Sequence, residues 1–396
     1  MSQADRWLLP DGIEELLPPQ AIALETQRRI LLDQFHQWGY ELIMPPQVEF
    51  LESLLTGVGH DLELQTFKVT DQLTGRMMGV SADITPQVAR IDAHSWPVNG
   101  ASRLCYCGTV LHTRAASLLS SRSPLQIGAE LYGEAGSNAD FEIISLMLQS
   151  VQAVGLKQVY LDLGHVGVYR ALVAAAGLNH EQQRQFSEAL LGKDVTAYAE
   201  LVNKHISASY QAAFTALITL NGEPAVIARA AEIFRDIPGA MAALQDLQAL
   251  TARIIARYPS LEIYVDLAEL RGYDYHTGVV FAAYVAGHGQ AIAKGGRYDQ
   301  TGSVFGRARP ATGFSADLKQ WVALTGVTSL TADAIFAPLD PSEQLWQAVQ
   351  KLRGEGKRVI SALSSTDSAQ TCNCNAQLVN VNGQWVVESI SLKGSA

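Results

Sequence analysis

One eight-residue stretch, Arg271 to Gly278, constrains this chain more than any other. It is Arg-Gly-Tyr-Asp-Tyr-His-Thr-Gly, and it lies between two runs that we expect to form β-strands, Glu262 to Leu267 and Val279 to Tyr284. So many polar groups at a strand end are costly to bury unless they hold a polar ligand. An arginine can bind a carboxylate through two hydrogen bonds, and the aromatic side chains can bind the rest of a small ligand. The stretch therefore predicts an amino-acid pocket; the alternative is a hairpin whose polar tip faces water.

The length and composition of the chain narrow its class. Its 396 residues can bury a large core and should divide into two or three domains. No apolar run approaches the ~18–20 residues that span a bilayer. The polar start of the chain, Met1 to Glu15, has no apolar signal core, so we expect a cytoplasmic protein that does not bind a membrane. The net charge of -10 also argues against a dominant nucleic-acid-binding surface.

The cysteines form two Cys-x-Cys pairs, Cys105 with Cys107 and Cys372 with Cys374. Four thiolates could bind zinc if the pairs met in space, but zinc ligand pairs usually have two to four residues between them. Reduced thiols in a reducing compartment are the favoured interpretation. We expect no metal and no cofactor.

Hydrophobic spacing predicts the order of elements in the first part of the chain. After Pro18 and Pro19, apolar residues at helical intervals predict a helix that stops at Gly39. Strands are expected over residues 40–44, 64–70, 76–80, 103–111, 125–132 and 158–163, and helices over about 85–91 and 138–153. Thr85 and Pro86 are expected to be the N-cap and the first residue of the earlier of these two helices.

Residues 165–258 differ from the rest, because they are rich in Ala, Gln and Leu and predict successive helices. Breaks are expected near residues 177, 192, 222–224 and 238–239. This pattern indicates a helical insertion between two halves of a mixed sheet. The glycine-rich segment Gly295 to Asp299 should then return to the pocket region, and a helix from Gly313 to about Thr325 should close a domain that spans residues 1–325.

Residues 334–396 predict a small second domain. We expect strands over 335–339 and 358–363, a helix over 342–352 between them, and two further strands at the end. At roughly sixty residues this unit is near the lower limit for an independent domain.

The pocket stretch resembles the histidine-binding segment of histidyl-tRNA synthetases, which usually has the form Arg-Gly-Leu-Asp-Tyr-Tyr-Thr-Gly. The resemblance covers roughly residues 5–325, including the order of elements and the helical insertion. It implies an α+β fold of the class II aminoacyl-tRNA synthetase type, with an antiparallel sheet, flanking helices and a dimeric assembly. The residue pattern alone indicates only a mixed α/β domain.

The resemblance also implies a role for two residues at the start of a helix. Asp83 and Thr85 stand where the family uses an acid and a threonine to bind the ammonium group of histidine, with Asp in place of the usual Glu. A carboxylate and a hydroxyl are suitable acceptors for an ammonium group. The alternative is that Asp83 simply complements the helix N-terminus.

A second part of the expected pocket comes from the strand over residues 125–132. Gln126, Gly128 and Glu130 should point to one face, which places an amide and a carboxylate on either side of a gap. In the family the Gln contacts the backbone groups of the amino acid and the Glu binds the imidazole. The alternative is a polar strand face in contact with water.

The pocket stretch supplies the remaining expected ligand-binding residues. Arg271 matches the family residue that binds the carboxylate of histidine. Tyr275 matches the first tyrosine of the family motif, and His276 replaces the second. His276 can still hydrogen-bond an imidazole, in a role that depends on its protonation.

The two arginines with which class II synthetases stabilise the adenylation transition state are missing. His112 stands at the position of the first and Gln320 at that of the second, and the loop from Ala115 to Ser123 also differs. Loss of one such group typically costs ~2.7–4 kcal/mol of barrier height. Arg114 and Lys319 are neighbouring cations, but their positions are shifted. We therefore expect a histidine pocket without adenylation chemistry.

A histidine pocket without adenylation resembles the regulatory subunits of ATP phosphoribosyltransferase, in which the pocket motif takes the form Arg-Gly-Tyr-x-Tyr-His-Thr-Gly. That resemblance implies a non-catalytic homodimer within a hetero-oligomer. Its partner would be the short-form catalytic subunit, which it would activate, and free histidine would be the feedback effector. The usual pattern has an arginine where His112 stands, which is a departure. The short, weakly basic second domain predicts no tRNA binding.

Three alternatives remain at this point. A divergent histidyl-tRNA synthetase would catalyse histidine-dependent ATP–pyrophosphate exchange. A stand-alone histidine-binding protein would bind histidine without affecting phosphoribosyl transfer. An enzyme with other acyl or phosphoryl chemistry would need a Ser-His-Asp, metal or phosphate-loop signature, and the sequence offers none.

Overall fold

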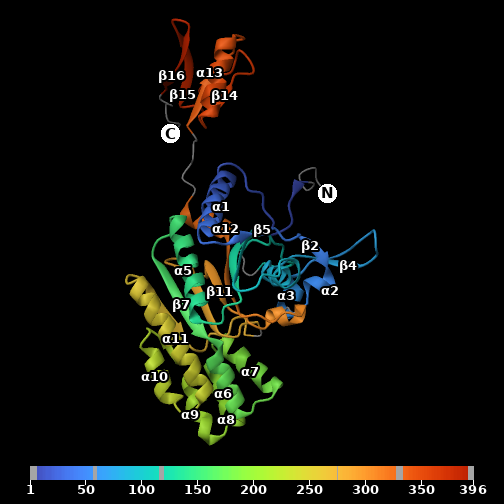
Figure 1. The fold of residues 1–396 in the computed structure, drawn as a ribbon, viewed down its shortest axis with the longest axis vertical. Helices are drawn as coiled ribbons and strands as arrows, with labels where there is room; N and C mark the ends of the chain where they lie inside the picture. Colours follow the sequence, from blue (N-terminus) through green and yellow to red (C-terminus); the bar gives the residue numbers. More distant parts are fainter. Residues whose placement is uncertain (1–6, 57–59, 116–119, 274, 327–332, 391–396) are drawn as a thin grey trace. The chain divides into compact units, whose positions relative to one another are not determined.

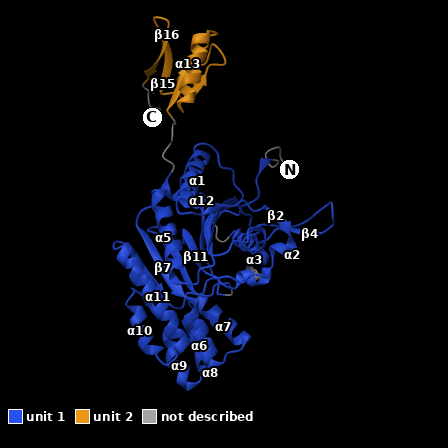
Figure 2. Ribbon diagram, viewed as in Figure 1, with its two compact units in different colours: residues 1–326 blue, residues 327–396 orange. Residues whose placement is uncertain are grey.

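The computed structural model describes residues 7–56, 60–115, 120–273, 275–326 and 333–390. The chain forms two compact units, residues 1–326 and residues 327–396, coloured separately in Figure 2. Each unit has its own sheet and its own clusters of buried apolar residues. No helix in the described ranges is both long and apolar enough to cross a membrane.

The first unit contains most of the secondary structure (Figure 1). Its strands are β1 (Glu41–Leu42), β2 (Val48–Phe50), β3 (Lys68–Thr70), β4 (Met77–Val80), β5 (Ser102–Thr109), β6 (Leu125–Tyr132), β7 (Val159–His165), β8 (Asn221–Gly222), β9 (Glu262–Asp266), β10 (Val279–Val285), β11 (Ala293–Arg297) and β12 (Ala311–Asp317). Its helices are α1 (Gln20–Gln37), α2 (Leu51–Leu54), α3 (His60–Gln65), α4 (Thr85–Arg90), α5 (Ser137–Ala153), α6 (Val166–Ala176), α7 (His180–Leu191), α8 (Val195–His205), α9 (Ala208–Leu217), α10 (Val226–Ile233), α11 (Pro238–Arg257) and α12 (Leu318–Thr325).

A nine-stranded sheet organises this unit, in the order β1-β5-β6-β12-β11-β10-β7-β9-β8. The six strands from β5 to β7 pair antiparallel, whereas β1 with β5 and β7 with β9 pair parallel. The expected antiparallel sheet with flanking helices, of the class II synthetase type, is confirmed. A separate three-stranded sheet pairs β2, β4 and β3.

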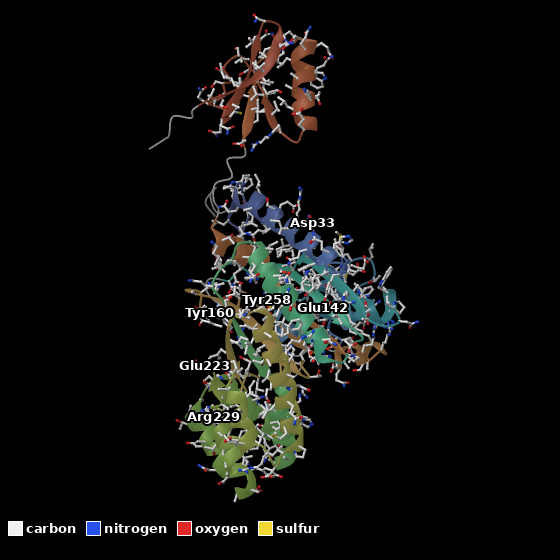
Figure 3. The ribbon with its side chains drawn as sticks, turned by 60° about the vertical axis from the view of Figure 1, so that its left-hand side comes forward. Asp33, Glu142, Tyr160, Glu223, Arg229 and Tyr258 are labelled. Atoms are coloured by element: carbon white, nitrogen blue, oxygen red, sulfur yellow. The ribbon has the colours of Figure 1, made fainter. Side chains whose placement is uncertain are left out.

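The two faces of the large sheet are covered differently. One face packs against α1, α5 and α11 and carries the main apolar core, which includes Phe35, Ile143 and Leu247. Glu142 on α5, labelled in Figure 3, forms an ion pair with Arg103 on β5 at 2.7 Å and so fixes that helix to the sheet. The opposite face carries a smaller cluster that includes residues of α4, and this second face holds the candidate site.

The stretch between β7 and β9 is helical, as the sequence predicted, and its helices α6 to α11 gather at one end of the first unit in Figure 1. The expected breaks near residues 177, 192, 222–224 and 238–239 are confirmed; the third includes the short strand β8, and the last falls at the start of α11. A further break at Ile206 and Ser207, between α8 and α9, was not predicted because neither residue is a glycine or a proline.

The helix predicted from Gly313 to Thr325 is wrong in its first half. Residues 311–317 form strand β12, and only residues 318–325 are helical. β12 is paired on both sides, with β6 and β11, so the ladder hydrogen bonds and the buried sheet face override the local pattern. Asp317 then accepts a hydrogen bond from the Lys319 backbone N–H at 3.0 Å and starts α12.

Two smaller expectations in the first unit also need correction. Thr85 is the first residue of α4, and the N-cap is Ile84, whose own side chain makes no capping hydrogen bond. The expected strand over residues 64–70 is shorter, because Leu64 and Gln65 end α3 and β3 begins at Lys68.

The second unit follows the predicted order of strand, helix, strand and two final strands. It contains β13 (Ala334–Ala337), α13 (Glu343–Gly354), β14 (Arg358–Ser361), β15 (Ala376–Val381) and β16 (Gln384–Ser389). These strands form a sheet in the order β14-β13-β15-β16. The Ser342 side chain caps α13 by accepting from the Leu345 N–H. All four cysteines are free thiols, one pair in each unit.

Candidate functional site

A row of glycines lies beside Glu130 and Tyr106 on the second face of the large sheet. Glu130 on β6 lies opposite Gly313 on β12, and Gly313 lies opposite Gly296 on β11. A Cβ atom at Gly313 would collide with the Glu130 carboxylate, and one at Gly128 would lie 2.5 Å from the Tyr106 Oη. The side chains of Glu130 and Tyr106 therefore use room that only glycine neighbours provide.

Glu130 is a buried acid with aromatic hydroxyls as its partners. Its exposed fraction is 1%. The Tyr106 hydroxyl donates to Oε1 at 3.1 Å, and the Tyr298 hydroxyl donates to Oε2. Burial raises the pKa of Glu130 to about 8, against the opposing effect of the Tyr298 hydrogen bond. No basic side chain of the described residues is hydrogen-bonded to it, so the acid is protonated near neutral pH.

Asp83, Thr85 and Gln126 join this cluster from the start of α4 and from β6. The Gln126 amide donates to Asp83 Oδ1 at 2.8 Å, and its oxygen accepts from the Ile84 N–H at 2.9 Å. Asp83 Oδ1 also accepts from the Thr85 N–H at 2.9 Å, so the carboxylate does contact the helix start. The Thr85 hydroxyl lies 3.2 Å from the Tyr106 hydroxyl. One contact chain therefore links all the predicted residues of α4 and β6.

Tyr275 reaches the same cluster through an aromatic stack. Its ring lies 4.9 Å from the ring of Tyr298 at an interplanar angle of 29°. Its hydroxyl is buried and makes no well-formed hydrogen bond within the described residues. Burial raises the pKa of Tyr275 well above its ordinary value, and the nearby Thr301 side chain has a smaller, lowering effect on that pKa. A buried phenol of this kind is a potential donor to a ligand.

His276 packs tightly between two glycines. A Cβ atom would lie 2.7 Å from the ring Nδ1 if added to Gly272 and 2.6 Å from Cδ2 if added to Gly296. Burial lowers the pKa of His276 to about 4, so the imidazole is neutral at physiological pH. Nδ1 is buried and makes no well-formed hydrogen bond within the described residues. Backbone groups of Arg271 and Gly272 are close enough to raise the pKa of His276, but burial has the larger, opposite effect.

Arg271 is placed differently from the other predicted residues. Its guanidinium donates to Glu269 Oε2 at 2.6 Å and to the Tyr284 hydroxyl at 2.8 Å, and its side chain is 52% exposed. The structure thus brings together Asp83, Thr85, Gln126, Glu130, Tyr275 and His276 on one sheet face. Arg271 is held at the edge of that face by an acid of the protein itself.

The sequence did not single out Tyr106 and Tyr298, which contribute the two hydroxyls bound to Glu130. Tyr298 lies in the glycine-rich segment expected to return to the pocket. The period of two along β5 places Tyr106 on the same face as Leu104. The missing information was the pairing of β5 with β6 and the placement of β11 next to β12, the other neighbour of β6.

The two residues that stand in place of the missing arginines make contacts within the protein. His112 Nε2 lies 2.9 Å from the Ala82 carbonyl oxygen, and the Gln320 amide lies 2.7 Å from His288 Nε2. Lys319 pairs with Glu14 at 3.0 Å, so this neighbouring cation is already neutralised. The loop from Ala115 to Ser123, which we expect to differ from that of the synthetases, includes residues 116–119, and these lie outside the described residues.

Comparison with protein families gives two adjacent matches. The model for histidyl-tRNA synthetase matches residues 12–321. The model for the C-terminal domain of ATP phosphoribosyltransferase subunit HisZ matches residues 332–388. The two matches together cover both compact units.

Individual relatives match over the full chain. A protein of Chromohalobacter salexigens is 52% identical over 99% of this chain and 100% of its own length, and one of Pseudomonas fluorescens is 50% identical over 99% and 100%. Both are named ATP phosphoribosyltransferase regulatory subunit. Among solved structures, a regulatory subunit/histidyl-tRNA synthetase of Bacillus halodurans superposes with a TM-score of 0.82 at 25% identity, covering 94% of this chain and 97% of that one. The histidyl-tRNA synthetase of Nostoc superposes with a TM-score of 0.77 at 16% identity, covering 97% of each chain.

Proposed function

Since this chain belongs to the family of ATP phosphoribosyltransferase regulatory subunits, we propose that it reports the histidine concentration to that enzyme and catalyses no step itself. Its place as a regulatory subunit in histidine biosynthesis follows from the family. The proposal adds the ligand, its site and the direction of regulation. It also places the chain in the cytoplasm, as a homodimer within a hetero-oligomer that contains the short-form catalytic subunit.

The observation that carries the proposal is the buried Glu130. It has two tyrosine hydroxyls as partners and a glycine-lined sheet face beside it. Its pKa of about 8 means that it holds a proton near neutral pH. An imidazole is a base that titrates in the same range, so it can share that proton and offset the cost of the buried acid. Histidine is the amino acid whose side chain fits this requirement.

The surrounding residues suit the other groups of histidine. Asp83 and Gln126 offer a carboxylate and an amide at the start of α4, which suits the ammonium group. Thr85 can add a hydroxyl acceptor there. The buried Tyr275 hydroxyl and the neutral ring of His276 supply further hydrogen-bonding groups. Arg271 can bind the carboxylate if it exchanges Glu269 for the ligand.

The absence of adenylation is supported by the two substituted positions. An imidazole and an amide stand at residues 112 and 320, and both make hydrogen bonds within the protein. Phosphoryl and acyl-phosphate transition states need fixed positive charge at such positions. A divergent synthetase is therefore the less favoured reading of this site.

Regulation requires that histidine affinity differ between two states of the complex. Histidine that binds the less active state more tightly shifts the complex toward that state, and the coupling is reciprocal. A coupling of ~1–3 kcal/mol changes activity several-fold to about a hundredfold. The proposal assigns activation to the subunit without histidine and inhibition to the subunit that has bound it.

The test is phosphoribosyl-ATP formation by the short-form catalytic subunit from the same source, with and without this chain, across a histidine titration. We expect the chain to raise the rate and histidine to suppress that rise only when the chain is present. An unchanged rate and unchanged histidine sensitivity would reject the regulatory role. Histidine-dependent ATP–pyrophosphate exchange by the chain alone would instead support the synthetase alternative.

A further inference from the structure

One arginine of the helical insertion contacts the pocket turn, which we define as residues 271–273 and 275–276. Arg170 on α6 directs its Nη2 to the carbonyl oxygen of Tyr273 at 2.7 Å and to that of His276 at 2.9 Å. Its guanidinium carbon also lies 4.6 Å from the centroid of the Tyr273 ring. A single side chain thus binds the turn at two backbone points and one ring.

The shape of the turn explains why an external donor is useful there. The backbone N–H groups of Tyr275 and His276 both donate to the Gly272 carbonyl oxygen, at 2.9 and 2.8 Å. These bonds make the segment resemble one turn of a helix that does not continue. The last carbonyl groups of such a turn need donors from elsewhere, and a cation is the favoured partner. Arg170 meets that need.

The turn is in direct contact with the proposed histidine pocket. Tyr275 stacks on Tyr298, whose hydroxyl is bonded to Glu130. The ring of His276 packs against Gly296, which lies in the glycine row beside Glu130. A shift of the turn would therefore move both side chains that it presents to the pocket.

The other end of the contact is built into the insertion. Tyr169, the neighbour of Arg170 on α6, meets the Tyr273 ring edge-on at 5.2 Å and 73°. Its hydroxyl donates to the Gln183 carbonyl oxygen on α7 at 3.0 Å. The Val166 N–H at the start of α6 also donates to the Gly278 carbonyl oxygen at 3.0 Å. Both α6 and α7 are thus joined to the turn through packed aromatic rings and hydrogen bonds.

We propose that Arg170 is a positioning residue for the histidine pocket and that it makes the pocket turn and the α6–α7 pair of the insertion energetically dependent on each other. The proposal rests on the proposed function, because it concerns the same pocket. The stretch departs from the synthetase form at Tyr273 and His276, the two residues whose carbonyl groups Arg170 binds. In this proposal histidine binding stabilises the turn, and linkage then requires that it also stabilises α6 and α7.

The first measurement is calorimetric titration of histidine into the full chain. Arg170→Ala removes two hydrogen bonds and one cation–π contact, and we expect about a tenfold loss of affinity. Arg170→Lys keeps a cation that can reach one carbonyl group and should restore part of the loss. Arg253→Ala is the matched control, because Arg253 lies 4.0 Å over the Phe141 ring and donates to Asn138 Oδ1 at 2.6 Å, outside the pocket. Its affinity should equal that of the wild type.

The second measurement is hydrogen exchange of the α6 and α7 amides with and without histidine. We expect histidine to slow exchange there in the wild type and in Arg253→Ala, and to have no such effect in Arg170→Ala at saturating histidine. Wild-type affinity in Arg170→Ala would overturn the positioning role. Unchanged histidine protection of α6 and α7 in that variant would overturn the coupling.

The controls separate this inference from the proposed function. If the wild type binds histidine, Glu130→Ala does not, and Arg170→Ala behaves as the wild type, only the role of Arg170 is rejected. If the wild type binds no histidine, the pocket assignment itself is rejected and the role of Arg170 with it.

Discussion

The two ends of the proposed pocket are prepared to different degrees. Around Glu130, every contact is buried and two tyrosine hydroxyls, from β5 and from the residue after β11, already hold the carboxyl group. Around Arg271, the guanidinium is half exposed and paired with Glu269, two residues away in the chain. The Glu130 end can bind a ligand without changing its own contacts. At the Arg271 end, the guanidinium must exchange the Glu269 carboxylate for that of the ligand.

This difference teaches which part of the site sets affinity and which part can report occupancy. A preorganised end contributes binding energy without reorganisation. An end that must change partners moves when the ligand arrives, and here the change lies in the pocket turn that Arg170 contacts. The comparison therefore predicts large effects at Glu130 and smaller, graded effects at Arg271 and Glu269.

The largest expected effect is the loss of histidine binding in Glu130→Ala, because the variant removes the acid that the proposal assigns to the imidazole. Calorimetric titration should detect no binding at millimolar histidine. Glu142→Ala is a matched control, since Glu142 is a partly buried acid bonded to Tyr40 and Arg103 away from the pocket. Wild-type affinity in Glu130→Ala, with a folded protein by circular dichroism, would contradict the pocket assignment.

The sequence predicted the buried end in part, and the reasons are specific. The alternation of Gln126, Gly128 and Glu130 along one strand placed an acid beside a gap, and strand β6 has the predicted bounds. The contacts of Tyr106 and Tyr298 with Glu130 could not be predicted, because the positions of β5 and β11 relative to β6 are set by the pairing of the whole sheet. For the same reason Gly313 was assigned to a helix, although it lies opposite Glu130 on a central strand.

The exposed end was harder to predict from sequence. Arg271 was identified by its chemistry and its motif, but its pairing with Glu269 depends on the local turn geometry. A sequence pattern specifies which side chains are available and does not specify which of two carboxylates an arginine binds in the empty pocket.

The pH dependence of stability should be the next largest effect, and it belongs to the buried end. The folded pKa of Glu130 is about 8, above the ordinary 4.5, so its contribution to folding is largest below about pH 4.5, falls as pH rises and is gone above about pH 8. Between pH 6 and pH 9 the wild type should lose about 3 kcal/mol more than Glu130→Gln, which cannot ionise. Urea denaturation at both pH values measures this difference. Parallel pH profiles for the two proteins would mean that Glu130 does not hold its proton in the folded state.

Arg271→Ala should weaken histidine binding by less than the loss at Glu130. A charged hydrogen bond contributes about 1.5–3 kcal/mol, but part of it is spent in displacing Glu269, so we expect a loss at the lower end, about tenfold. The measurement is the histidine dissociation constant, with histidinol as a second ligand because it lacks the carboxylate. Arg271→Ala should bind histidinol as the wild type does. An equal loss for both ligands would show that Arg271 does not bind the carboxylate.

The smallest expected effect is a gain, and it tests the exchange of carboxylates directly. Although burial raises it, hydrogen bonds from Arg271 hold the pKa of Glu269 below its ordinary value, so the acid is charged and competes with the ligand for Arg271. Glu269→Gln removes that charge but keeps an amide oxygen that can accept from the guanidinium. Histidine should then bind about two- to fivefold more tightly, since a partly exposed ion pair contributes about 0.2–1 kcal/mol.

Glu181→Gln, which removes the same charge from an exposed pair with Arg184 on α7, should leave the affinity unchanged. Weaker binding in Glu269→Gln would mean that Glu269 holds Arg271 in place for the ligand, so that both ends of the pocket are preorganised and the contrast between them is lost.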